Sequence, residues 1–170
     1  MIKQDISENQ VNIVYLALGS NLGNRIKNIE KAKLLLIKNN ISLISVSKYY
    51  ETASWPNPKN PKFINIVLKA KCLLNPNQLL NLCKSIEVKL GRKKTLKNSP
   101  RECDIDIIDF NSLILKGKLN LPHKRMHKRN FVLFPLFEIE KTWFHRLKKK
   151  NIKTLIFSLS NNDIRSIKQF

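Results

Sequence analysis

Residues 100–110 read Pro-Arg-Glu-Cys-Asp-Ile-Asp-Ile-Ile-Asp-Phe, a run that is as apolar as a buried strand apart from its charged side chains. Asp104 and Asp106 are separated by one residue, so on a strand they point to the same face, with α-carbons roughly 6–7 Å apart. Carboxylates on a face otherwise covered by Ile and Phe are costly unless something pairs with them. A pair of divalent metal ions roughly 3.5–4 Å apart would provide that pairing.

Arg101 lies three residues before Asp104 and adds a cation that can fork onto phosphate oxygens. A carboxylate pair, an implied metal and an arginine together indicate phosphoryl-type chemistry. One alternative stays open for this segment: it could be an edge strand on which Asp104 and Asp106 simply face water.

The length and the chain ends predict the domain organisation. We expect the 170 residues to form a single domain, residues 1–170, that buries about two thirds of the surface of its unfolded form. Residues 1–10 are expected to be a polar tail and residues 140–170 a C-terminal extension. Because no stretch approaches the ~18 apolar residues of a spanning helix and no apolar signal region opens the chain, we expect neither secretion nor membrane insertion.

The cysteines and the charge limit the choice of partners. Cys72, Cys83 and Cys103 are an odd number without Cys-x-x-Cys spacing, which predicts small reduced core residues and a cytoplasmic protein. The net charge of +20 suggests nucleic acid, but it comes mostly from lysines expected on solvated faces. We therefore predict that the charge steers small anions such as nucleotides, with no nucleic-acid partner.

Apolar periodicity predicts an alternation of strands and helices typical of an α+β, ferredoxin-like βαββαβ core with a C-terminal arm and extra helix, an antiparallel sheet flanked by helices. The first predicted helix carries its apolar stripe on Ile26, Ile29, Leu34, Leu35 and Ile37. On the third strand, Asn65 shares a face with Phe63 and Val67. The predicted elements are strands at 11–18, 41–50 and 63–73 and within 100–110, helices at 25–39 and from Asn75-Pro76 to Gly91, loops at 55–61 and 92–99, and a short final helix.

Taken together, the motifs resemble those of the 6-hydroxymethyl-7,8-dihydropterin pyrophosphokinase family over about residues 14–139. Each motif alone is weak, but their joint occurrence at compatible spacings is specific. The motifs are Tyr15-Leu-Ala-Leu-Gly-Ser-Asn-Leu-Gly-Asn-Arg25, Tyr50-Glu-Thr52, Phe63-Ile-Asn65, Glu87 with Gly91-Arg92, Pro100-Arg101 followed by Asp104-Ile-Asp106, Pro122-His123, and Arg129-Asn-Phe131 before Pro135-Leu136.

The resemblance implies an ATP-dependent transfer of diphosphate to the hydroxymethyl group of the pterin, in folate biosynthesis, by a monomer. It implies that Asp104 and Asp106 hold two Mg²⁺ ions, that Asp104 is the nearest acceptor for the substrate's proton, and that Arg92 and Arg101 act in catalysis. The pterin would be bound by Thr52, Phe63, Asn65 and Phe131, and the nucleotide by Glu87, Arg92, Lys94, Arg101, His123 and Arg129.

Plainer roles remain for several of these residues. Phe63 and Phe131 could be core aromatics, His123 a surface residue, and Glu87 a solvated helix charge. The chain also departs from the family pattern: Lys94 replaces an arginine and Asn98 lies where an aromatic is usual. Lysine keeps the charge but loses the bidentate fork, so this loop could hold phosphate less firmly.

Three other functions stay open at this point. A basic ferredoxin-like fold could bind RNA, although the aromatic strand motif of such modules is missing. A metal-dependent nuclease could use the same aspartate pair, although the chain has only 12 acidic residues. A catalytically silent homologue would be expected to have lost Asp104, Asp106 or Asn65, and it has lost none of them.

Overall fold

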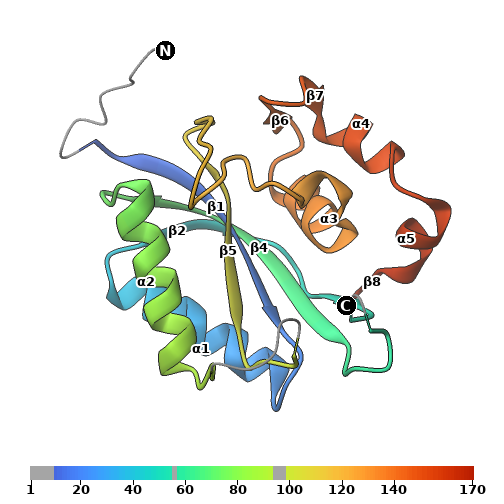
Figure 1. Ribbon diagram of the computed structural model, residues 1–170, viewed down its shortest axis with the longest axis horizontal. Coiled ribbons are helices and arrows are strands. Elements are labelled where there is room, and N and C mark those ends of the chain that lie inside the picture. Colours follow the sequence, from blue (N-terminus) through green and yellow to red (C-terminus); the bar gives the residue numbers. More distant parts are fainter. Residues whose placement is uncertain (1–9, 55–56, 94–98) are drawn as a thin grey trace.

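The computed structural model describes residues 10–54, 57–93 and 99–170, and its centre is an antiparallel sheet (Figure 1). The strands follow the order β5-β1-β4-β3-β8, with β2 also paired to β4. This confirms the ferredoxin-like α+β core, because the strands next to β1 come from the second half of the core. The strands of the sheet are β1 (Asn12–Ser20), β2 (Ser42–Val46), β3 (Tyr50–Thr52), β4 (Phe63–Cys72), β5 (Asp104–Phe110) and β8 (Lys168–Gln169).

Helices cover both faces of this sheet (Figure 1). On β4, Ile64, Ile66 and Leu68 belong to the core under α1 and α2, whereas Val67 packs with α3 and α4. The predicted alternation along this strand is therefore confirmed. The helices are α1 (Arg25–Lys38), α2 (Pro76–Lys89), α3 (Asn130–Ile139), α4 (Ile152–Phe157) and α5 (Asn161–Ser166), and the smaller elements are a 3₁₀ turn at Met126–Lys128 and a two-stranded ribbon of β6 (Phe144–His145) and β7 (Lys150–Asn151).

The predicted strand at 41–50 is wrong in one respect, since the segment forms two strands, β2 and β3. Ser47 lies at the break. Its N–H donates to the carbonyl of Val67, and its Oγ accepts from the N–H of Val67 at 3.0 Å. A short polar side chain that bonds the backbone in this way competes with regular strand pairing, and the break cannot be read from apolar periodicity.

The predicted apolar stripe of the first helix is also partly wrong. Of its members, Ile29 is fully buried, whereas Ile26, Leu34 and Ile37 are exposed. The buried face of α1 consists of Ile29, Ala32 and Leu36, which follow the i, i+3, i+7 spacing of one helix face. Isoleucine and leucine occur on all sides of this helix, so their positions alone predict a wider buried face than the structure has.

The C-terminal extension holds more structure than the single final helix that was predicted. It contains two short helices, α4 and α5, and its last strand, β8, pairs with β3 at the sheet edge. Lys168 and Gln169 are both exposed and carry no apolar alternation. Nothing in the sequence pattern could therefore indicate a strand there.

The three cysteines are buried and free, as predicted for small core residues. Burial raises the pKa of the Cys83 and Cys103 thiols to about 12, which keeps both protonated at neutral pH. Within residues 10–54, 57–93 and 99–170, no helix has the length and apolar character needed to cross a membrane.

Helix α2 begins as predicted, at Asn75 followed by Pro76. Asn75 Oδ1 accepts from the N–H of Gln78 at 2.9 Å, and the Gln78 side chain accepts from the N–H of Asn75 at 2.8 Å. The two residues thus satisfy two backbone donors that a helix start leaves open.

We predict that Asn75→Ala lowers the free energy of unfolding by about 1 kcal/mol, because it removes this cap. Asn77→Ala is the matched control: Asn77 is an exposed residue of the same first turn, and alanine is a good helix former. Urea unfolding followed by circular dichroism measures both. Equal stabilities of the two variants would contradict the role of the cap.

Candidate active site

A row of three residues crosses three neighbouring strands, β4, β1 and β5. The register pairs Gly19 of β1 with Asn65 of β4 on one side and with Asp104 of β5 on the other. A Cβ at Gly19 would lie 2.9 Å from Asn65 Oδ1 and 3.4 Å from Phe63 Cδ1, so the position has no room for a side chain. Gly19 therefore forms a low floor between a polar amide and a carboxylate.

A cavity of about 1120 Å³ lies over this floor, on the face of the sheet that α3 covers farther along. Residues of β1, β4 and β5, the C-terminal end of α2, the start of α3 and the C-terminal segment line it. Single-ligand pockets commonly measure about 300–1,000 Å³. The cavity is thus large enough for two ligands side by side.

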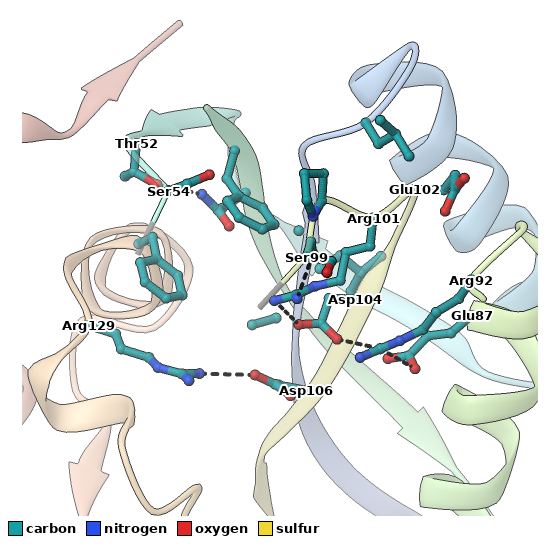
Figure 2. A pocket seen from close by; sticks show the side chains of 18 of the residues that line it. Thr52, Ser54, Glu87, Arg92, Ser99, Arg101, Glu102, Asp104, Asp106 and Arg129 are labelled. Atoms are coloured by element: carbon teal, nitrogen blue, oxygen red, sulfur yellow. Dashed lines mark hydrogen bonds and ion pairs between the residues drawn. The ribbon is translucent and has the colours of Figure 1, made fainter. Parts of the chain in front are cut away.

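The carboxylates of β5 point into this cavity and are held by arginines (Figure 2). Asp104 Oδ1 lies 2.6 Å from Arg92 Nη1, and its Oδ2 lies 3.1 Å from Arg101 Nη2. Asp106 Oδ2 lies 3.0 Å from Arg129 Nη1. The alternative of an edge strand is right about the strand, because β5 lies at one edge of the sheet. It is wrong about the aspartates, whose side chains are only 23% and 31% exposed and carry these ion pairs.

The arginines also decide the ionisation of Asp104. Burial alone would raise its pKa, but the guanidinium groups of Arg101 and Arg92 outweigh burial and lower the pKa. The carboxylate therefore stays charged throughout the neutral range.

Glu87 of α2 is buried beside this cluster, with its side chain 1% exposed. Its Oε1 accepts from the N–H of Ile105 at 2.8 Å, and its carboxylate contacts Lys84 Nζ at 3.0 Å and Arg92 Nη1 at 2.5 Å. The alternative of a solvated helix charge is thus wrong. Burial raises the pKa of Glu87, and the neighbouring N–H and Lys84 oppose that effect. Glu87 fixes Arg92 between two carboxylates.

The side chains predicted for a flat ligand gather at the other end of the cavity. Asn65 is 6% exposed, and its Nδ2 donates to Thr52 Oγ1 at 3.1 Å. Phe63 and Phe131 are partly buried and line the cavity, so neither is an ordinary core aromatic. The guanidinium of Arg101 lies 5.4 Å from the Phe63 ring centroid, which brings the aromatic and charged ends together.

Of the remaining residues predicted for nucleotide binding, the structure describes His123 but not Lys94. His123 lines the cavity, with Nε2 3.8 Å from Asp106 Oδ2, and burial lowers its pKa, so it is no ordinary surface residue. Lys94 and Asn98 lie outside the described residues.

Several lining residues were not found from the sequence. Lys84 could have been recognised, since it precedes Glu87 by three residues on one helix face. Gly19 belongs to the motif at residues 15–25, for which no ligand role was predicted. Arg125, Lys128, Asp163 and Ser166 carried no pattern that marks a site. With these, seven lysines and arginines line the cavity against five carboxylates, which gives it a net positive charge suited to anions.

The aspartate pair is a suitable but incomplete metal site. Within the part of the chain that the structure describes, no group of three or more His, Cys, Asp and Glu side chains could hold a metal ion. Asp104 and Asp106 thus offer two oxygen-donor side chains. Mg²⁺ is often bound by one or two carboxylates together with substrate phosphates and water, so the donor set fits Mg²⁺ accompanied by a phosphorylated ligand.

Comparison with known proteins agrees with this geometry. Residues 15–141 match the family model described as 7,8-dihydro-6-hydroxymethylpterin-pyrophosphokinase (HPPK). The chain is 40% identical over 141 residues to the 2-amino-4-hydroxy-6-hydroxymethyldihydropteridine pyrophosphokinase of Aquifex aeolicus, covering 82% of this chain and 88% of that protein. It is 41% identical over 130 residues to the enzyme of the same name from Bacillus subtilis, covering 75% and 78% of the two chains.

Longer proteins contain a similar segment. The chain is 38% identical over 127 residues to a mitochondrial folate synthesis bifunctional protein of Arabidopsis thaliana, and this match covers 74% of this chain and 23% of that one. Among solved structures, the Plasmodium falciparum HPPK-DHPS crystallised with pteroate has a TM-score of 0.72 at 18% identity, covering 88% of this chain and 42% of that one. This second likeness shows the shared fold.

We predict that Glu87→Gln lowers the free energy of unfolding by about 1–3 kcal/mol, because the amide removes the buried charge that pairs with Lys84 and one of the two carboxylates that hold Arg92. Glu102→Gln is the control, since Glu102 is a partly buried carboxylate at the same cavity. Urea unfolding at neutral pH compares them. A Glu87→Gln variant as stable as the control would show that the buried charge adds nothing.

Proposed function

This chain belongs to the 7,8-dihydro-6-hydroxymethylpterin-pyrophosphokinase family, and from that premise we propose how its cavity carries out the family's reaction. The enzyme uses ATP as co-substrate and transfers diphosphate to the hydroxymethyl group of 6-hydroxymethyl-7,8-dihydropterin, which yields AMP and the pterin diphosphate for folate synthesis. The observation that carries the proposal is the single cavity in which an aromatic, amide-lined end adjoins a cluster of arginines and carboxylates.

The aromatic end is the proposed pterin subsite. Phe63 and Phe131 would enclose the flat ring, an arrangement that ring quadrupoles favour. Asn65 can donate and accept hydrogen bonds at the ring's amide edge, and its contact with Thr52 fixes the direction of the amide.

The charged end is the proposed triphosphate subsite. Arg92, Arg101 and Arg129 already lie at the carboxylates and would turn their free donors to phosphate oxygens, with His123 beside them. Glu87 would keep Arg92 at this position. Lys94, which lies outside the described residues, stays a predicted nucleotide ligand.

Asp104 and Asp106 would hold the two Mg²⁺ ions. When bound, these ions would supply neutralisation of the charge that develops on the transferred phosphoryl group. The side chains themselves would position the two substrates for in-line attack, which is most of what phosphoryl transfer requires. The lowered pKa of Asp104 makes it a weak base, so its main contribution would be charge and position.

A cytoplasmic location and a monomeric state complete the proposal. The buried, free thiols of Cys72, Cys83 and Cys103 support a reducing compartment. One chain supplies the residues proposed for both substrates, which supports a site formed within a monomer.

A single assay tests the reaction. The protein is incubated with Mg²⁺ and ATP, with and without 6-hydroxymethyl-7,8-dihydropterin, and the nucleotides are separated by chromatography. AMP that forms only when the pterin is present supports the proposal. ADP formation, AMP without pterin, or cleavage of added RNA would support another function.

We predict that Asp104→Asn and Asp106→Asn each lower kcat at least about 100-fold with the fold intact, because each removes charge stabilisation that acts chiefly in the transition state. Glu102→Gln removes one charge from the same cavity and should keep kcat within about 2-fold. Near-normal turnover of Asp106→Asn would contradict the role of the pair.

We also predict that Asn65→Ala and Gly19→Ala weaken pterin binding at least about 10-fold while ATP-analogue binding changes little. The first removes the amide that pairs with the ring edge, and the second adds a methyl group 2.9 Å from that amide. Gly23→Ala is the control, because its positive φ of 63° costs stability while its added methyl group would have no contact with Asn65 within 4 Å. Calorimetric titrations that show equal losses for both ligands would contradict this assignment.

A further inference from the structure

The C-terminal segment, Ser160–Phe170, returns to the cavity after α4. Figure 1 shows α5 and β8 running back along the α3 side of the sheet to its β3 edge. Asp163 and Ser166 of this segment line the cavity. The whole segment lies beyond residues 15–141, which match the family model, so the family assignment gives it no role.

The first link between this segment and the cavity is the side chain of Asn130, at the start of α3. Its Nδ2 donates to the carbonyl of Asp163 at 2.6 Å and lies 3.1 Å from Ser166 Oγ. Its Oδ1 accepts from the N–H of Phe131 at 2.7 Å. One buried amide thus connects the C-terminal segment to the backbone of an aromatic residue that lines the cavity.

This amide is important because α3 begins without a conventional cap. The N-cap residue, Arg129, makes no side-chain cap bond, and its guanidinium is engaged with Asp106 instead. The bond from Asn130 is therefore a local constraint on the first turn of α3, where Arg129 and Phe131 enter the cavity.

The second link is backbone pairing at the sheet edge. Gln169 pairs with Tyr50 and Lys168 with Glu51, while the N–H of Phe170 donates to the carbonyl of Tyr49 at 3.1 Å. The ring of Phe170 also stacks on that of Tyr49, with centroids 6.1 Å apart. Strand β3 ends at Thr52, the partner of Asn65.

Helices of six residues and strands of two have little stability of their own. Segment Ser160–Phe170 is therefore held in place mainly by these two links, one to the start of α3 and the other to β3. The elements it joins carry Phe131 and Thr52, both of which line the aromatic end of the cavity.

We propose that segment Ser160–Phe170 is the outer wall of the pterin subsite and that Asn130 is a positioning residue, which holds Phe131 over the ring by bonding this wall. The inference rests on the proposed function for the identity of the ring. It makes the C-terminal segment a determinant of pterin affinity in particular, because Arg129 of the triphosphate subsite keeps its own ion pair with Asp106.

The variant Asn130→Asp separates the two bonds of the amide. A carboxylate still accepts from the N–H of Phe131 but cannot donate to Asp163 or Ser166, and it repels the Asp163 carbonyl. We expect the KM for the pterin to rise about 10-fold, with the KM for ATP within about 2-fold of the unmodified enzyme. Ser166→Ala removes one partner only and should raise the pterin KM by about 2- to 5-fold.

Ser158→Ala is the matched control for Ser166→Ala. Both serines are exposed, and each donates through Oγ to a carbonyl three residues earlier, but only Ser166 also contacts Asn130. Ser158→Ala should leave both KM values unchanged. If Asn130→Asp leaves the pterin KM unchanged, or raises both KM values equally, the positioning role is refuted.

Hydrogen exchange separates failure of this inference from failure of the proposed function. In Asn130→Asp without ligands, the backbone amides of Asp163–Phe170 should exchange at least about 10-fold faster than in the unmodified protein. Unchanged protection of these amides would refute the proposal that Asn130 holds this segment in place. In the unmodified protein, the pterin should slow exchange of these amides. An enzyme that forms AMP normally while the pterin leaves these amides unaffected refutes this inference alone, whereas absence of pterin-dependent AMP refutes the function.

Discussion

The pairing of β1 with its two neighbours is the constraint on which the site depends. This strand lies between β4 and β5, and its register brings Asn65 and Asp104 to either side of Gly19 although they are far apart in the sequence. A slip of one residue would turn both polar side chains to the opposite face. The register is kept by the other face of the same strands, where Leu18, Ile66 and Ile105 are buried under α1 and α2.

The charged side chains of the cavity lie on the face of β1, β4 and β5 opposite to this apolar core. Removing three carboxylates from water would be costly if they stood alone. Arg92 contacts both Glu87 and Asp104, and Arg129 contacts Asp106, so each carboxylate has a partner in the absence of ligand. The same guanidinium groups line the cavity, where each offers further N–H donors to an anion. Paired charges of this kind are weak evidence for stability but strong evidence for an anion site, because they preorganise donors before the anion arrives.

The sequence predicted those parts of the site that short-range geometry controls. Two residues on one strand share a face whatever the fold, so Asp104 with Asp106 and Phe63 with Asn65 could be paired in advance. The burial of Glu87 could not, since it depends on the N–H of Ile105, which is close only after α2 packs on β5. The family resemblance placed these residues in one site but carried no information on how they are held.

The C-terminal strand, β8, is a second element that the sequence could not predict, because its order depends on contacts with distant residues. Lys168 and Gln169 have no apolar pattern, and their order comes from backbone bonds to β3 and from the stacking of Phe170. The floor of the cavity is thus made by β4, β1 and β5 with a dense apolar core beneath them, whereas one wall is made by a segment with no buried side chain in α5. Opening a weakly held wall costs less than disturbing the sheet. Any adjustment of the cavity to its ligands should therefore occur in this wall, while the carboxylates on the floor keep their positions.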